Sequence, residues 1–320
     1  MVNPGDFTIA GAVAGLTITL SGIIIGLGIA FGSKKLLNRG KEELIQGILS
    51  AALVGLFMSL ITSTDTVALS LLPPVEGATG SVSYLTTLFS HTLTTVDTVT
   101  AKLVECSHIL HYIASIKVNL NVVEVKPFNS LDNLGSLLDG QVKIFNGVRM
   151  LTSAEILFLK FVETTTLTVF LPAGLALRAF FMTRKIGGAL LAIGLGFYLV
   201  YPLVMLTGTS FVTIDDASTE ELNDNIDDFV NDYKDVALFP DLNNEGAVID
   251  MVNAISEGGS KGYIVERTYQ LINEVSSFAA DLIFFLVILP LLSLVITVYS
   301  IYELSRVFGG EIIASSFDYL

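Results

Sequence analysis

The chain has 320 residues, of which 52% are hydrophobic and only 15% are charged, with a net charge of −14 and a mean hydropathy of +0.70. Soluble domains carry about 25% charged residues, so this composition argues against an ordinary soluble protein. The negative net charge means that the chain as a whole does not attract nucleic acid or anionic lipid.

Four long apolar stretches, and a fifth interrupted by a few polar residues, dominate the chain. They are Phe7–Phe31, Leu44–Leu72, Ile156–Ala179, Ile186–Thr207 and Leu282–Ser300. Each supplies the ~20 residues with which an α-helix crosses ~30 Å of hydrocarbon. The sequence therefore predicts an all-α, polytopic helical membrane protein with about five transmembrane helices, for which the lipid bilayer is the first partner.

The first stretch carries glycine at helical spacing. Gly11, Gly15, Gly22 and Gly26 fall on nearly one face of a helix. Small residues let helices approach closely in lipid, so we expect this face to pack on another span, in the same chain or in a neighbouring copy. The alternative is that glycine is simply common in membrane helices.

Because the first basic residue is Lys34, we expect this span to be retained rather than cleaved as a signal peptide.

Lysine and arginine mark three places between or after the spans. The basic residues are Lys34, Lys35, Arg39 and Lys41 after the first span, Arg178, Arg184 and Lys185 between the third and fourth, and Arg306 after the fifth. Short basic loops stay on the cytoplasmic side. We therefore expect a multi-pass protein of the cell membrane with its N-terminus outside and its C-terminus in the cytoplasm.

This orientation divides the chain into five segments. We expect spans one and two in residues 1–72, an extracellular helical segment in 73–150, spans three and four in 151–207, an extracellular acidic helical cap in 208–277, and span five with a cytoplasmic tail in 278–320.

The first outer segment has a helical pattern. Apolar residues recur at three-and-four spacing from Val82 to Ile113, broken only by Thr92. The pattern fits one long amphipathic helix or a helical hairpin. Because lysine and arginine are sparse, it favours packing on protein over resting on lipid. Residues 127–150 mix turn, polar and apolar residues, which predicts an interfacial connector with a short helix around Leu131–Leu138.

The single cysteine, Cys106, lies close in sequence to His108 and His111. A zinc site needs three or four ligands, and the only other histidine is His91. We therefore expect a buried, inert thiol here and no metal site.

The second outer segment is strongly acidic, with fifteen Asp and Glu against three Lys and Arg between Gly208 and Ser277. Thr219 opens a predicted amphipathic helix, and a second apolar face runs from Val248 to Ile255. From about Tyr263 a helical pattern continues into the fifth span. The acids lack the spacing of a calcium-binding loop, so we interpret them as a solvated surface.

Two charged residues fall near the outer end of the third span. Lys160 and Glu163 are three residues apart, so one helix face can pair them. Ionisable groups in membranes are functional candidates, and the alternative for Glu163 is an interfacial position. Pro172 and Pro290 each interrupt a span and predict a bend.

No catalytic constellation is visible in the sequence. Walker A, HExxH and GxSxG motifs are missing, as is any nucleophile–base arrangement. We expect no enzymatic activity, no catalytic residues and no cofactor.

Two stretches carry a resemblance to a known family. They are FLPAGLALRAFFMTRKIGGALLAIGLGFYLVYPL, from Phe170 to Leu203, and FFLVILPLLSLVITVYSIYELSRVFGGEI, from Phe284 to Ile312. The matching features are Arg178, Thr183, Arg184, Gly187, Gly188, Tyr201, Pro202, Ser305, Arg306, Gly309 and Gly310. They resemble a group of archaeal polytopic membrane proteins, similar to the channel component of the Ced-type DNA import machinery and to the polytopic channel subunit of conjugative type IV secretion systems.

The resemblance implies a membrane subunit of a DNA-translocation apparatus that forms or lines an oligomeric channel. DNA would be the substrate, a homo-oligomer the assembly, and a secretion-type ATPase and a small pilin the partners. Arg178, Arg184, Lys185 and Arg306 would then crowd the cytoplasmic mouth and meet phosphate, or they would only fix topology. Gly187 and Gly188 would allow close packing or a bend. The alternative function is a non-transporting membrane scaffold whose extracellular helical cap anchors a surface filament or an envelope layer.

Overall fold

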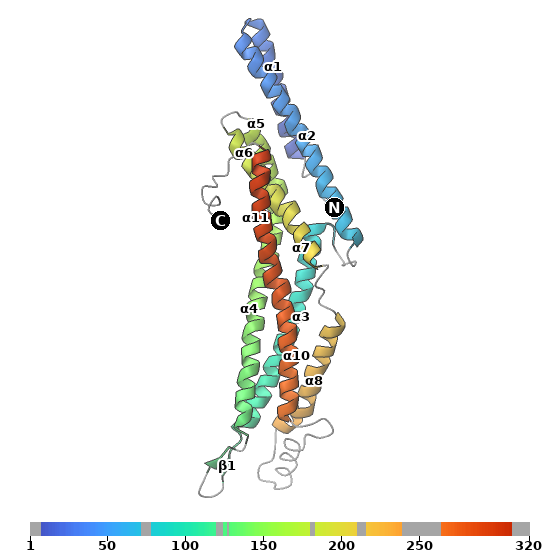
Figure 1. Cartoon of the computed structure of the whole chain (residues 1–320), viewed down its shortest axis with the longest axis vertical. Coiled ribbons are helices and arrows are strands. Elements are labelled where there is room, and N and C mark those ends of the chain that lie inside the picture. Colours follow the sequence, from blue (N-terminus) through green and yellow to red (C-terminus); the bar gives the residue numbers. More distant parts are fainter. Residues whose placement is uncertain are drawn as a thin grey trace. The chain divides into compact units, whose positions relative to one another are not determined.

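The computed structural model describes residues 8–71, 78–119, 124–126, 128–179, 183–209, 216–238 and 264–308 (Figure 1). These residues are helical apart from short turns and a two-residue antiparallel pair, β1 Val118–Asn119 with β2 Glu124–Val125. Five of the helical segments are long and apolar enough to cross a membrane. The predicted all-helical architecture, with five helices long and apolar enough to span a membrane, is therefore confirmed.

The chain divides into two compact units. Unit 1 contains residues 1–89, 155–211 and 289–320, and unit 2 contains residues 90–154 and 212–288. The first four predicted spans lie in unit 1, as does most of the fifth. Most of the two segments predicted to lie outside the membrane belongs to unit 2.

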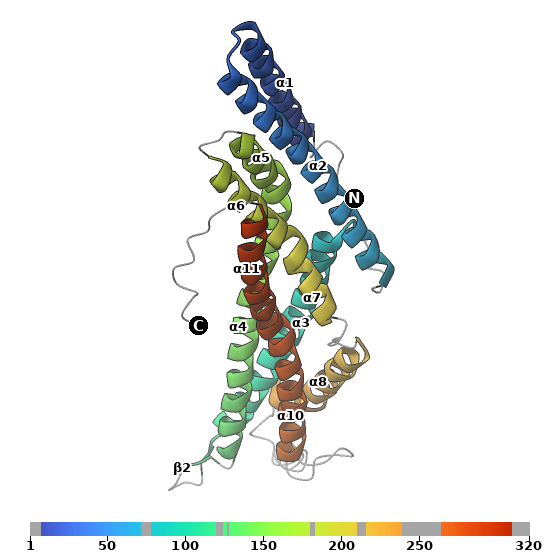
Figure 2. The same ribbon diagram turned by 45° about the horizontal axis from the view of Figure 1, so that its top comes forward.

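Unit 1 begins with a tight antiparallel pair of helices, α1 Thr8–Ala30 and α2 Lys34–Leu71 (Figure 2). Gly32 makes the connection with a φ of +63°, a conformation that favours glycine. A Cβ on Gly28 would meet the Leu37 backbone nitrogen at 2.8 Å, so glycine allows the two backbones to touch. The basic residues from Lys34 to Lys41 thus lie in the first turns of α2, not in the loop that the sequence predicted, because charged residues are good helix formers.

Glycines also set the spacing among the other helices of unit 1, which are α5 Leu171–Ala179, α6 Arg184–Leu195, α7 Tyr201–Thr209 and α11 Leu289–Val307. A Cβ on Gly196 would meet Ile301 Cγ1 at 2.1 Å, and one on Gly208 would meet Leu289 Cδ1 at 2.1 Å. The segment from α6 to α7 therefore packs closely along α11, as small residues allow in membrane bundles.

Three short π-helical segments interrupt the long helices, and each ends two residues before a proline. They are η2 Thr166–Phe170 before Pro172, η3 Gly196–Val200 before Pro202, and η5 Phe284–Ile288 before Pro290. Proline has no N–H and its ring clashes with the carbonyl four residues back. A wider turn, such as that closed by the Leu171 N–H on the Thr166 oxygen, accommodates both defects without ending the helix.

The start of helix α3 Ser81–Ser115 is fixed by a carboxylate from α2. Asp65 Oδ1 accepts hydrogen bonds from the Ser81 backbone nitrogen at 2.7 Å and from Ser81 Oγ at 2.8 Å. An acid at a helix N-terminus satisfies exposed N–H groups and complements the helix dipole. The sequence left open whether this region is one helix or a hairpin, and it is one helix whose apolar face is buried from Val82 to Ile113.

Unit 2 packs residues 90–115 of α3 with the first part of α4 Ser130–Thr165, with α8 Asp216–Leu238 and with α10 Ile264–Ile283. Lys102 Nζ lies 2.7 Å from Asp227 Oδ2, which joins α3 to α8. Phe145 of α4 stacks on Phe278 of α10 with ring centroids 6.2 Å apart. The segments predicted as two separate outer regions thus share one core.

The sequence predicted an interfacial connector over residues 127–150. This prediction is wrong, because α4 is already helical from Ser130 onward. Leu131, Leu138 and Phe145 recur every seven residues and are all buried. This burial outweighs the poor helix propensity of the intervening glycines. The second apolar face predicted in the acidic segment, from Val248 to Ile255, lies outside the described residues.

Candidate functional site

The predicted basic mouth divides into buried and exposed members. Arg178, at the end of α5, is only 8% exposed, and its Nε and Nη1 atoms have no hydrogen-bond partner among the described residues. Lys185, in the first turn of α6, is exposed. Arg184 beside it is partly buried and forms an ion pair with Glu43 of α2, with Nη2 to Oε2 at 3.3 Å.

Arg306 lies near the end of α11 and is exposed. Its Nη1 lies 3.5 Å from Glu303 Oε1, and its guanidinium lies 5.8 Å from the centroid of the Tyr302 ring. An exposed pair of this kind leaves the cation able to exchange partners, because surface ion pairs are weak. Lys185 and Arg306 therefore present accessible positive charge, whereas Arg178 does not. Gly309 and Gly310, which follow Arg306, lie outside the described residues.

The glycines predicted for helix packing also fall into two groups. Gly187 and Gly188 are buried, and a Cβ on Gly187 would meet the Arg178 backbone nitrogen at 2.5 Å. Gly11, Gly15, Gly22 and Gly26 instead lie on an exposed face of α1. A Cβ on any of these four would meet no atom within 4 Å. This face, which we call the open glycine face, is thus uncovered by the described residues of the chain.

Lys160 and Glu163 are both exposed on α4, and no ion pair joins them among the described residues. A different acid in the same helix is engaged. Glu155 accepts a hydrogen bond from the hydroxyl of Tyr201, which is 1% exposed. Phe158 lies against the Tyr201 ring with centroids 5.3 Å apart. The polar contact that joins α4 to α7 therefore involves Glu155, which the sequence did not single out, rather than Glu163.

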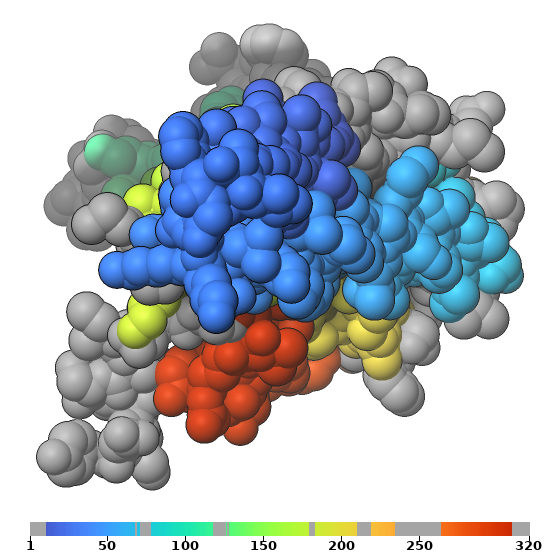
Figure 3. Space-filling model, turned by 90° about the horizontal axis from the view of Figure 1, so that it is seen from above, coloured from blue at the N-terminus to red at the C-terminus, as the bar shows by residue number. Residues whose placement is uncertain are grey.

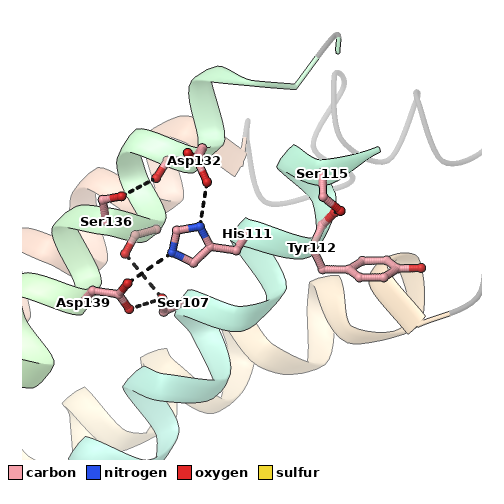
Figure 4. Close-up of polar contacts among 8 residues, drawn as sticks. Ser107, His111, Tyr112, Ser115, Asp132, Ser136 and Asp139 are labelled. Atoms are coloured by element: carbon pink, nitrogen blue, oxygen red, sulfur yellow. Dashed lines mark hydrogen bonds and ion pairs between the residues drawn. The ribbon is translucent and has the colours of Figure 1, made fainter. Parts of the chain in front are cut away.

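Unit 2 contains a cluster of polar side chains between α3 and α4 (Figure 4). The imidazole of His111 lies between two carboxylates of α4, with Nδ1 2.8 Å from Asp132 Oδ1 and Nε2 3.3 Å from Asp139 Oδ2. Ser107, one turn before His111, is fully buried and its hydroxyl donates to Asp139 Oδ1 at 2.5 Å. We call these four residues the His111 cluster.

The two carboxylates favour the charged form of the imidazole. The hydrogen bond to Asp132 raises the pKa of His111, and the contact with Asp139 acts in the same direction against the opposing effect of burial. Ser107 binds Asp139 and not the imidazole, so histidine does not activate this hydroxyl as it does in a catalytic triad. The cluster is therefore suited to holding α3 and α4 together in a pH-dependent manner.

Cys106, which precedes Ser107 of this cluster, differs in exposure from the nearby His108. Cys106 is buried, whereas His108 is exposed. Burial raises the pKa of the Cys106 thiol to about 12, so the thiolate is not formed at neutral pH. Within the described ranges, no group of three or more His, Cys, Asp or Glu residues is placed to hold a metal ion.

Comparisons of the chain with protein-family models, with curated proteins and with solved structures find no match.

Proposed function

We propose that this chain is a membrane subunit of a conjugation-like DNA-translocation apparatus, and that copies of it assemble into an oligomeric channel in the cell membrane. The observation that carries the proposal is the open glycine face of α1, where a Cβ on Gly11, Gly15, Gly22 or Gly26 would meet no atom of the described residues within 4 Å. In a bilayer, glycine gains nothing by facing lipid, but it lets two helices approach closely. The occupant that we propose is α1 of a second copy.

The outer surface of the first two helices supports assembly. Figure 3 shows the surface of α1 and of much of α2 as seen from above. Large apolar side chains of these two helices are exposed, including Leu16, Ile23 and Leu56. Lipid covers part of such a surface, and contact with another copy covers the rest.

Exposed cations support DNA as the substrate. Lys185 and Arg306 lie at the ends of helices predicted to face the cytoplasm. Phosphates that pass an oligomeric opening would meet one such pair from each copy. The Phe170–Leu203 and Phe284–Ile312 stretches resemble DNA-import channel subunits, which adds to this support. A secretion-type ATPase would supply the energy and a small pilin the outer path.

DNA uptake tests the proposal. A strain that lacks the gene is expected to lose uptake and to regain it when the wild-type chain is restored. Lys185→Ala combined with Arg306→Ala is expected to lower uptake about tenfold, because each lost cation weakens phosphate binding. Lys160→Ala, an exposed cation on α4, serves as the matched control and is expected to restore full uptake. Normal uptake in the deletion strain would refute transport and leave the scaffold function.

Cross-linking tests the assembly separately. In a Cys106→Ser background, cysteine replaces Gly15 or Gly22 on the open glycine face, and membranes are treated with a mild oxidant. Disulfide-linked dimers are expected from both variants. Gly147→Cys is the matched control, because Gly147 is an exposed glycine of α4 with equally open surroundings. Equal dimer yields from the control and the α1 variants would contradict self-association through α1.

A further inference from the structure

We infer that the corner between α5 and α6 binds a phosphate group, supplied either by a lipid headgroup or by free phosphate in solution. The ligand is a resident anion rather than translocated DNA, so the inference does not depend on the proposed function. It rests on Arg178, on the charges around it and on the start of α6.

Arg178 is a buried cation, and two of its three side-chain nitrogen atoms lack a hydrogen-bond partner among the described residues. The residue is only 8% exposed, and the atoms without a partner are Nε and Nη1. Burying a charged donor without a partner is strongly unfavourable, because the ion loses its hydration and gains no hydrogen bond in return. An arginine in this position is therefore stable only if an acceptor joins it.

The nearby charges require an anion. Arg184 is close enough to Arg178 for the two positive charges to repel each other. Glu43 pairs with Arg184 at 3.3 Å and neutralises one of these cations. Among the described residues, the positive charge of Arg178 has no such partner, and a bound anion would balance it.

The backbone contributes positive potential at the same place. Helix α6 begins at Arg184, and the hydroxyl of its N-cap residue, Thr183, donates to the Leu177 oxygen at 2.7 Å instead of accepting from α6. The first turn of α6 therefore receives no side-chain cap from Thr183. A helix N-terminus carries about half a positive charge and binds phosphate through backbone N–H groups.

Gly187 brings these elements together. A Cβ at this position would meet the Arg178 nitrogen at 2.5 Å and the Gly174 oxygen at 2.5 Å, so glycine allows the end of α5 to lie directly on α6. Arg178 therefore leaves the backbone within one turn of the start of α6.

The chemistry of the group favours phosphate over carboxylate. Guanidinium forms two parallel hydrogen bonds to either group, but phosphate has further oxygens that can accept from the backbone N–H groups at the start of α6. The site also lies at the end of two predicted spans, where lipid headgroups are concentrated. Basic pockets between membrane helices bind such headgroups.

Retained phosphorus tests the inference. The full chain is purified in a non-ionic detergent and washed, and bound phosphorus is measured by chemical assay and by native mass spectrometry. The wild type is expected to retain about one phosphate group per chain and Arg178→Gln to retain about tenfold less, because a charge-assisted pair is lost. Arg306→Gln, which removes an exposed cation of the same unit, is expected to behave as the wild type.

A second arm distinguishes the two sources. The thermal unfolding temperature of the washed protein is measured in sodium phosphate and in sodium chloride of equal ionic strength. In a separate experiment, the protein is reconstituted in vesicles with and without phosphatidylglycerol and analysed by native mass spectrometry. Mass addition of an intact phospholipid assigns the site to a headgroup, whereas stabilisation by sodium phosphate alone assigns it to free phosphate. Arg178→Lys keeps the charge and is measured in parallel in case the glutamine variant does not fold. A wild type that retains no phosphorus and gains no stability in any arm would overturn the inference, as would equal retention by Arg178→Gln.

Discussion

Gly135 of α4 lies directly beneath the imidazole of His111 of α3. A Cβ on Gly135 would approach His111 Cε1 and Nε2 to 2.9 Å, closer than side chains tolerate. The absence of a side chain at Gly135 is therefore what allows the imidazole to lie between Asp132 and Asp139. The hydrogen bonds of the cluster thus require glycine at this position of α4.

Gly135→Ala is expected to destabilise unit 2 by about 1–3 kcal/mol, because the added methyl group displaces the His111 ring from both carboxylates. Chemical unfolding of the purified protein in detergent, followed by circular dichroism, measures this loss. Gly147→Ala on the same helix is the control. Its new methyl group would meet no atom within 4 Å, so it is expected to be neutral or to stabilise by about 0.5–1 kcal/mol. Equal effects of the two substitutions would show that the His111 contact contributes nothing.

The stability of unit 2 is expected to depend on pH through His111. The pKa of His111 is raised in the folded state, chiefly by its hydrogen bond to Asp132. A group with a raised folded pKa contributes its full stabilisation below the unfolded value, about 6.5 for histidine, and loses it as pH rises through the folded value. Unfolding free energies measured from pH 5 to pH 9 should therefore fall on the alkaline side.

Variants identify the group responsible for that pH dependence. His111→Gln removes the titrating group and should flatten the profile in this range. Asp132→Asn keeps the histidine but lowers its pKa in the folded state, so the decrease in unfolding free energy should move to lower pH. A profile of His111→Gln that is superimposable on the wild type would assign the pH dependence to another group.

The contact between Glu155 and Tyr201 is expected to stabilise unit 1. Tyr201→Phe removes the donor and leaves the partly buried carboxyl of Glu155 without this partner, which should cost about 1–3 kcal/mol. Glu155→Gln keeps an acceptor for the tyrosine hydroxyl and should cost less. Thermal unfolding in detergent measures both losses, and the double variant measures their coupling. Additive losses would mean that the two side chains do not interact.

The sequence was sufficient to predict five helices of membrane-spanning length but not the extent of every helix. Apolar length alone predicts the stretches from Phe7 to Phe31 and from Ile186 to Thr207, because lipid demands it. The beginning of α4 was missed because Gly135, Gly140 and Gly147 resemble loop residues. The seven-residue repeat of Leu131, Leu138 and Phe145 carried the correct signal.

Side-chain partnerships were harder to predict than helices. His111 and Asp139 are 28 residues apart, and Glu155 and Tyr201 are 46 apart, so each contact depends on the register between antiparallel helices. Hydropathy does not encode that register. The burial of Arg178 was equally hard to predict. The sequence shows a basic turn, but it does not show how closely α5 packs on α6 at Gly187.

The account depends most on the placement of the chain in the membrane, and labelling of intact cells with a membrane-impermeant maleimide tests it most directly. The native thiol provides a silent background, since Cys106 is buried and its pKa is raised to about 12. Cysteine at Asp228, an exposed position of α8, is expected to react in intact cells. Cysteine at Lys185, an exposed position at the start of α6, is expected to react only after the cells are opened. Reaction of the Lys185 position in intact cells, or protection of the Asp228 position, would contradict the proposed orientation and with it the cytoplasmic placement of the basic helix ends.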